Sequence, residues 1–110
     1  MNDEKWREMW DAAQTVQRHL YVDEIIPRRL TVDEWTVSVN VEWDQLGRAA
    51  TSVFEDAGTL PINAWTAGGF DYCGVRGRVE GVEIDVKAWR ASNRPQPART
   101  VADLLAGEQR

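Results

Sequence analysis

The fold is decided by residues 70–89, FDYCGVRGRVEGVEIDVKAW, in which apolar and polar residues alternate on both sides of Glu80-Gly81. A two-residue turn at Glu80-Gly81 predicts a β-hairpin with strands over 70–79 and 82–89. On one face, apolar and small residues then pair: Val79 with Val82, Gly77 with Ile84, Val75 with Val86, and Cys73 with Ala88. The other face pairs Arg78 with Glu83, Arg76 with Asp85, Gly74 with Lys87, and Tyr72 with Trp89. A shift of one residue would destroy both patterns, so this register is strongly specified.

Two helical patterns and one strand precede the hairpin. Apolar residues at helical spacing predict an amphipathic helix over 3–20, with a stripe of Trp6, Met9, Trp10, Ala13, Val16, Gln17 and Leu20. The alternation from Trp35 to Trp43 predicts a strand with one buried face. Asp44 is the expected N-cap of a second helix over 45–57, which Gly58 would end.

The segments between these elements are less regular. Residues 31–34, TVDE, have capping-box spacing, which predicts at most one helical turn there. Residues 60–66 read as a short extended piece that Gly68-Gly69 ends. If this piece joins the sheet, it completes a strand–helix–strand crossover.

The C-terminal part has a different composition. Pro95 and Pro97 predict an extended linker over 91–99, after a single domain over 1–90. Thr100 would cap a short helix within residues 100–110, with Val101, Leu104 and Leu105 on one side. A helix this short must dock on the body, dock on another chain, or fray.

Together these elements predict an α+β fold, a two-layer sandwich. Two amphipathic helices would cover the Val/Ile face of a three- or four-stranded, mostly antiparallel sheet. A length of 110 residues fits one domain with one core.

Composition narrows the expected partners and location. The net charge is −5, which makes nucleic acid an unlikely partner. A single cysteine, Cys73, excludes an internal disulfide. Nothing at the start resembles a signal peptide, and no apolar stretch approaches the ~20 residues of a membrane span. We therefore expect a cytoplasmic protein that does not enter a membrane.

Few residues suggest catalysis. His19, the only histidine, lies near the end of the first helix, where a half-buried imidazole or a cation at the helix C-terminus explains it better than a base or ligand would. Cys73 falls on the apolar face, where a cysteine is usually inert. No zinc spacing and no phosphate-binding glycine loop is present. We expect neither a cofactor nor a metal.

One pattern bears comparison with an enzyme family. Asp71, followed on the next strand by Asp85-Val86-Lys87, resembles the signature of the PD-(D/E)xK nucleases. The resemblance implies that Asp71, Asp85 and Lys87 bind Mg²⁺ and orient a water molecule. This chain departs from the pattern, because Asp71 has the parity of the apolar face while Asp85 and Lys87 share the other. A bulge near Gly74 would be needed to bring them together.

The aromatic residues suggest a binding surface instead. Tyr72 and Trp89 fall on the polar face of the hairpin beside Arg76 and Arg78, and Trp65 lies near glycines. Large rings with arginine anchor many interfaces, although the two rings could also merely shield the sheet end, or a helix could cover this face. The first hypothesis is a small acidic, non-catalytic protein-binding module. It would be an inhibitor of the immunity or phage anti-host type, or a self-associating factor, with the Mg²⁺-dependent nuclease as the alternative.

Overall fold

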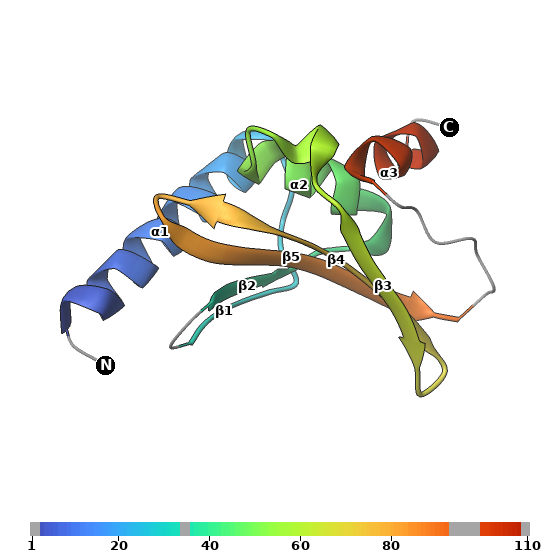
Figure 1. Ribbon diagram of the computed structural model, residues 1–110, viewed down its shortest axis with the longest axis horizontal. Coiled ribbons are helices and arrows are strands. Elements are labelled where there is room, and N and C mark those ends of the chain that lie inside the picture. Colours follow the sequence, from blue (N-terminus) through green and yellow to red (C-terminus); the bar gives the residue numbers. More distant parts are fainter. Residues whose placement is uncertain (1–2, 34–35, 93–99, 109–110) are drawn as a thin grey trace.

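The computed structural model describes residues 3–33, 36–92 and 100–108. Their elements are α1 (Asp3–Val22), β1 (Arg29–Val32), β2 (Thr36–Asn40), the 3₁₀ turn η1 (Trp43–Gln45), α2 (Leu46–Val53), the 3₁₀ turn η2 (Ala57–Thr59), β3 (Ile62–Ala67), β4 (Phe70–Val79), β5 (Val82–Ala91) and α3 (Val101–Glu108). Over these residues the fold is α+β, with three α-helices on one side of a five-stranded mixed sheet (Figure 1). The predicted α+β class is confirmed.

The β4–β5 hairpin has the predicted register. The pairing runs without interruption from Val79 opposite Val82 to Phe70 opposite Ala91. Glu80 and Gly81 both have positive φ angles, 53° and 78°, as a type I′ turn requires. The right-handed twist of this turn matches that of the strands, so the hairpin closes without a bulge.

The sheet is larger than predicted and has mixed strand directions. Its order is β1-β2-β5-β4-β3. The central pair β2 and β5 is parallel, with Val37 opposite Ile84, while the other neighbours are antiparallel. The prediction of three or four strands was therefore wrong in number. The short extended piece near Ile62 does join the sheet, as β3.

The described residues of the segment with capping-box spacing, 31–33, begin in a strand and form no helical turn. Thr31 lies in β1 and pairs with Ser38 of β2. The Asp33 carboxylate accepts a hydrogen bond of 2.8 Å from the Thr36 backbone N–H, and the Asp33 N–H donates to the Thr36 carbonyl at 3.1 Å. An aspartate carboxylate can accept a bond from the N–H three residues later whether that N–H belongs to a helix start or, as here, to the first residue of a strand.

The core lies between the sheet and the helices. The buried side of α1 carries Met9, Ala12, Ala13, Val16 and Leu20. These residues face sheet residues such as Val37, Val39, Ile84 and Val86. Trp6 and Trp10, which the sequence placed on the apolar stripe, are 37% and 51% exposed. They lie beside the buried stripe, not within it.

The second helix is shorter than predicted. It ends at Val53, because Phe54 adopts an extended conformation and is buried. Gly58 lies in η2 and does not have the positive φ expected of a helix stop. Asp44 lies inside η1, and Gln45 at the N-cap of α2 makes no side-chain capping bond.

The C-terminal helix packs against the body of its own chain. The Thr100 hydroxyl accepts a hydrogen bond of 3.2 Å from the Asp103 N–H, as expected of an N-cap. Thr100 also forms a β-bridge with Pro61, and Val101 is fully buried. Most of the predicted linker, residues 93–99, lies outside the described residues. No helix in the described part of the chain is long and apolar enough to cross a membrane.

Candidate functional site

One face of the sheet carries the predicted binding residues. Strand residues alternate, so the side chains that do not face α1 and α2 form a second surface that no helix of the described ranges covers (Figure 1). We call this surface the open face. Its residues on β3, β4 and β5 include Trp65, Phe70, Tyr72, Arg76, Arg78, Glu83, Asp85, Lys87 and Trp89.

A row of aromatic rings crosses the open face. Trp65 of β3 stacks on Tyr72 of β4, with ring centroids 5.2 Å apart and planes 7° from parallel. Phe70 lies 6.5 Å from Tyr72, and Tyr72 pairs in register with Trp89 of β5. The Arg28 guanidinium lies 4.8 Å from the centre of the Trp89 ring. Trp65 is 50% exposed and Phe70 is 41% exposed, so apolar area remains in contact with water.

The charges on the open face are mainly positive. Two ion pairs join Arg76 to Glu83 at 3.5 Å and to Asp85 at 3.7 Å, and a third joins Arg28 to Glu42 at 3.6 Å. Arg29, Arg78 and Lys87 belong to the same face. Although the chain has a net charge of −5, the described part of this face carries five basic groups and three acidic ones.

The residues of the nuclease resemblance are not brought together. Asp71 pairs with Arg90 and faces the helices, whereas Asp85 and Lys87 lie on the open face. Asp85 pairs with Arg76, five residues along β4 from Asp71, which is roughly 16 Å at the usual rise of a strand. The uninterrupted pairing contains no bulge near Gly74. A shared Mg²⁺ site for these three side chains does not form in this arrangement.

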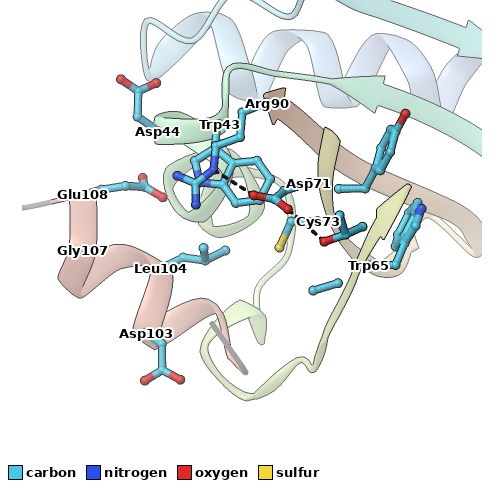
Figure 2. A pocket seen from close by; sticks show the side chains of 13 residues that line it. Trp43, Asp44, Trp65, Asp71, Cys73, Arg90, Asp103, Leu104, Gly107 and Glu108 are labelled. Carbon is cyan, nitrogen blue, oxygen red and sulfur yellow. Dashed lines mark hydrogen bonds and ion pairs between the residues drawn. The ribbon is translucent and has the colours of Figure 1, made fainter. Parts of the chain in front are cut away.

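On the helix side, a cavity of about 520 Å³ lies between α3 and the ends of β3, β4 and β5 (Figure 2). The Asp71 carboxylate, 7% exposed, accepts a hydrogen bond of 2.9 Å from the Thr66 hydroxyl. Arg90 lies 3.7 Å from this carboxylate, and its guanidinium carbon is 4.1 Å from the centre of the Trp43 ring. The Asp71–Arg90 ion pair and the Trp43 indole thus lie together at one end of the sheet, on the side that faces the helices.

The nucleophilic candidate near this cavity, the Cys73 thiol, is not activated. Burial raises the pKa of the Cys73 thiol to about 11, although Arg90 opposes the shift. The thiol is therefore protonated at neutral pH. His19 lies elsewhere, with Nδ1 2.9 Å from the Ser52 carbonyl of α2. Within the described residues, no three His, Cys, Asp or Glu side chains are grouped so as to hold a metal ion.

The C-terminal helix is held by an acid that caps α2. Glu108 accepts hydrogen bonds from the backbone N–H groups of Gly47 at 2.7 Å and of Arg48 at 3.1 Å. These N–H groups belong to the first turn of α2. In the first turn of a helix, the backbone N–H groups have no carbonyl partner within the helix. Gly47 permits the close approach, because a Cβ there would lie 2.9 Å from the Leu104 Cβ. Leu104 and Leu105 pack against the core beside it.

Glu108 makes the stability of this contact depend on pH. Burial raises its pKa above the ordinary 4.5, as does Asp44, while the bonds from Gly47 and Arg48 oppose the shift. A raised pKa means that the folded state binds the proton more tightly, so stability is lost as pH rises through that pKa. Compared with Glu108→Gln, the native chain is therefore expected to gain stability as pH falls from neutral to about 4.

Urea unfolding of both chains at the two pH values measures this difference. Groups that titrate elsewhere affect both chains alike, so only the position-108 contribution remains. A difference that is constant with pH, or that moves against the native chain in acid, would contradict the assigned contact.

Several residues of the cavity were not predicted. The pairing of Arg90 with Asp71 could have been predicted from the sequence, because extending the hairpin register by one pair beyond Tyr72–Trp89 places Arg90 opposite Asp71. Trp43 and Glu108 reach the site only through tertiary packing, and no local pattern indicates their partners.

Comparison of the sequence with models of known protein families gives no match, and comparison with curated proteins gives none either. The functional conclusion therefore depends on the residues and their geometry.

Proposed function

We propose that this chain is a non-catalytic protein-binding module whose open face docks an acidic segment of a partner protein. The observation that carries the proposal is the row of partly exposed rings, Trp65, Tyr72 and Trp89, set among arginines on a sheet face that α1–α3 leave uncovered. Aromatic residues and arginine supply much of the energy at protein interfaces. The excess of basic groups favours a partner rich in Asp and Glu.

The ring geometry favours a protein over single-stranded nucleic acid. Bases bind by stacking on the flat faces of aromatic side chains. Here Trp65 and Tyr72 each cover one face of the other ring, and Arg28 covers one face of Trp89. Glu83 and Asp85 also hold Arg76 in ion pairs, which leaves less of its charge for a phosphate. Exposed ring edges beside arginines suit apolar and acidic side chains better.

The mode of action we propose is occupation of the partner's surface, as in small inhibitors, within the cytoplasm. Support comes from the chemistry of the candidate groups. Cys73 is a protonated thiol, and the Asp71 carboxylate lies on the opposite face of the sheet from Asp85 and Lys87. A module of this kind needs a stable surface and no reacting group.

The test is a selection of short random peptides displayed on phage, followed by affinity measurement with the purified full chain. The selected peptides are expected to be rich in Asp and Glu with an apolar residue, and to bind less tightly as salt rises. Trp65→Ser is expected to weaken the binding at least about tenfold, since it removes the most exposed ring of the row. Trp10→Ser is the matched control, because Trp10 of α1 is 51% exposed against 50% for Trp65.

Two outcomes would overturn the proposal. One is that selected peptides carry no acidic bias, or bind equally well to the Trp65→Ser chain. The other is that an oligothymidylate binds the native chain more tightly than any selected peptide, which would assign the open face to nucleic acid.

A further inference from the structure

The cavity beneath α3 has the size and the mixed lining of a small-molecule site. Its volume of about 520 Å³ falls within the roughly 300–1,000 Å³ of pockets that bind small ligands. Its apolar lining consists of Trp43, Ala64, Leu104 and Cys73, whose thiol is protonated. A lining of this kind favours a ligand with an apolar body, and the polar groups then decide which functional group the ligand carries.

Arg90 is the polar residue of the lining that indicates the ligand's functional group. Its guanidinium carries several N–H donors, and within the described residues none of them makes a hydrogen bond. The ion pair with Asp71 is 3.7 Å long, which exceeds hydrogen-bond distance, and Nε is buried. Partly buried polar groups normally have hydrogen-bond partners, because an unmade bond costs free energy. Unused donors at the wall of a cavity therefore favour a ligand that supplies the acceptor.

The contact with Trp43 holds Arg90 in place without using its donors. The guanidinium carbon lies 4.1 Å from the centre of the Trp43 ring, and this attraction acts between the cation and the face of the ring. Asp71 approaches the guanidinium at Nε, which leaves the two terminal nitrogens for a second acceptor (Figure 2). Two such nitrogens donate parallel hydrogen bonds to the two oxygens of a carboxylate. Arg90 is thus oriented in advance for a carboxylate ligand.

The carboxyl groups of the lining leave this position to a ligand. Those of Asp44, Asp71, Asp103 and Glu108 line the cavity beside the guanidinium. Glu108 accepts two hydrogen bonds from the first turn of α2, which offset its charge. Figure 2 shows the carboxylates of Asp44 and Asp103 pointing away from Arg90. Among the described residues, Asp71 alone forms an ion pair with Arg90.

We propose that this cavity binds a small carboxylate with an apolar body. The ligand carboxylate accepts hydrogen bonds from the terminal nitrogens of Arg90, and the apolar body packs against Trp43 and Leu104. The Asp71 carboxylate is held by Arg90 and by the Thr66 hydroxyl, so the acid nearest to the guanidinium is already satisfied. The cavity lies on the helix side of the sheet, and the proposal does not depend on the open face.

Titration of the full chain with phenylacetate and with hexanoate tests the proposal, with the Trp43 indole N–H signal as the reporter. Both carboxylates are expected to shift the Trp43 signal and to leave that of Trp10, on α1, in place. Phenylacetamide has the same shape without the charge, and it is expected to bind at least about tenfold more weakly. Phenethylamine has the opposite charge and inorganic phosphate has no apolar body, so both are expected to bind more weakly than phenylacetate.

Two variants locate the ligand in the cavity. Arg90→Lys keeps a positive charge beside Asp71 but lacks the paired donors, so phenylacetate is expected to bind at least about tenfold more weakly. Ala64→Phe places a ring on the cavity side of β3, because Ala64 pairs with the buried Cys73, and it is expected to weaken binding to a similar degree. Ala67→Phe is the matched control. Ala67 is also exposed but has the opposite parity, so binding is expected to stay unchanged.

Circular dichroism checks that each variant is folded before its affinity is compared. The proposal is overturned if neither carboxylate shifts the Trp43 signal, or if phenylacetamide binds as tightly as phenylacetate. Tighter binding of phenethylamine would assign the cavity to cations, and tighter binding of phosphate would assign Arg90 to anions without an apolar body. Unchanged affinity of the Ala64→Phe or the Arg90→Lys chain would place the bound carboxylate outside the cavity.

Discussion

Replacing Ile84 with alanine is expected to lower the free energy of unfolding by about 2–5 kcal/mol. Ile84 is fully buried at the centre of the sheet, opposite Val37 of β2 and Gly77 of β4. Truncation removes apolar contacts and leaves a cavity that the surrounding strands cannot fill. Since small domains are stable by only about 5–15 kcal/mol, a loss of this size is a large fraction of the total.

The matched control lies three residues away on the same strand. Lys87 has the opposite parity and lies on the open face, so Lys87→Ala is expected to change stability by less than about 0.5 kcal/mol. Urea titration of the two variants compares the loss of unfolding free energy on the helix-covered face of β5 with the loss on its open face. Equal losses at both positions, or a greater loss at Lys87, would contradict the register of β5.

Replacing Arg90 with methionine is expected to lower the free energy of unfolding by about 2–4 kcal/mol. Asp71 is 7% exposed, and without the guanidinium its carboxyl group would lose its ion-pair partner in a poorly hydrated place. The expected loss is set below the full value for a buried pair, because the Arg90 side chain is 32% exposed.

A double variant separates the ion pair from simple packing. Asp71→Leu combined with Arg90→Met removes both charges, so it is expected to recover most of the stability that Arg90→Met loses. If the double variant is no more stable than the single one, the contribution of Arg90 lies in its packing on Trp43 and not in its charge.

Short-range patterns predicted the hairpin well. Residues 70–89 carry three agreeing signals, namely period-two alternation, opposite charges across the strands, and a turn that tolerates positive φ at Glu80-Gly81. The same local consistency indicated α1 and the cap at Thr100. Where several local rules agree, the sequence specifies the structure strongly.

Long-range packing accounts for what was missed. β1 has only four residues, and the last two, Thr31 and Val32, lie in the segment with capping-box spacing. The parallel pairing of β2 with β5 joins segments more than forty residues apart, which no local pattern records. Glu108 caps α2 from the far end of the chain, so the expected local cap at Asp44 was wrong.

Of the two surfaces described, the open face and the cavity beneath α3, only the open face was predicted from the sequence. Alternation placed Tyr72, Trp89, Arg76 and Arg78 on one surface, and the structure adds the stacking of Trp65 on Tyr72. Alternation alone cannot show whether a second layer covers a sheet face, because that depends on where the helices pack. Trp6 and Trp10 were placed on the apolar stripe of α1 for a related reason, since a wide apolar stripe contains both buried and flanking positions.

The central claim is that a partner binds the open face, and the tryptophan indole N–H signals in a nitrogen–proton correlation spectrum test it most directly. Trp89 reports on the open face, Trp65 on the open face and on the rim of the cavity beneath α3, Trp43 on that cavity, and Trp6 and Trp10 on α1. On addition of the tightest selected acidic peptide, the signals of Trp65 and Trp89 are expected to shift while those of Trp6, Trp10 and Trp43 stay in place. A shift confined to Trp43 or to the α1 tryptophans would contradict the claim.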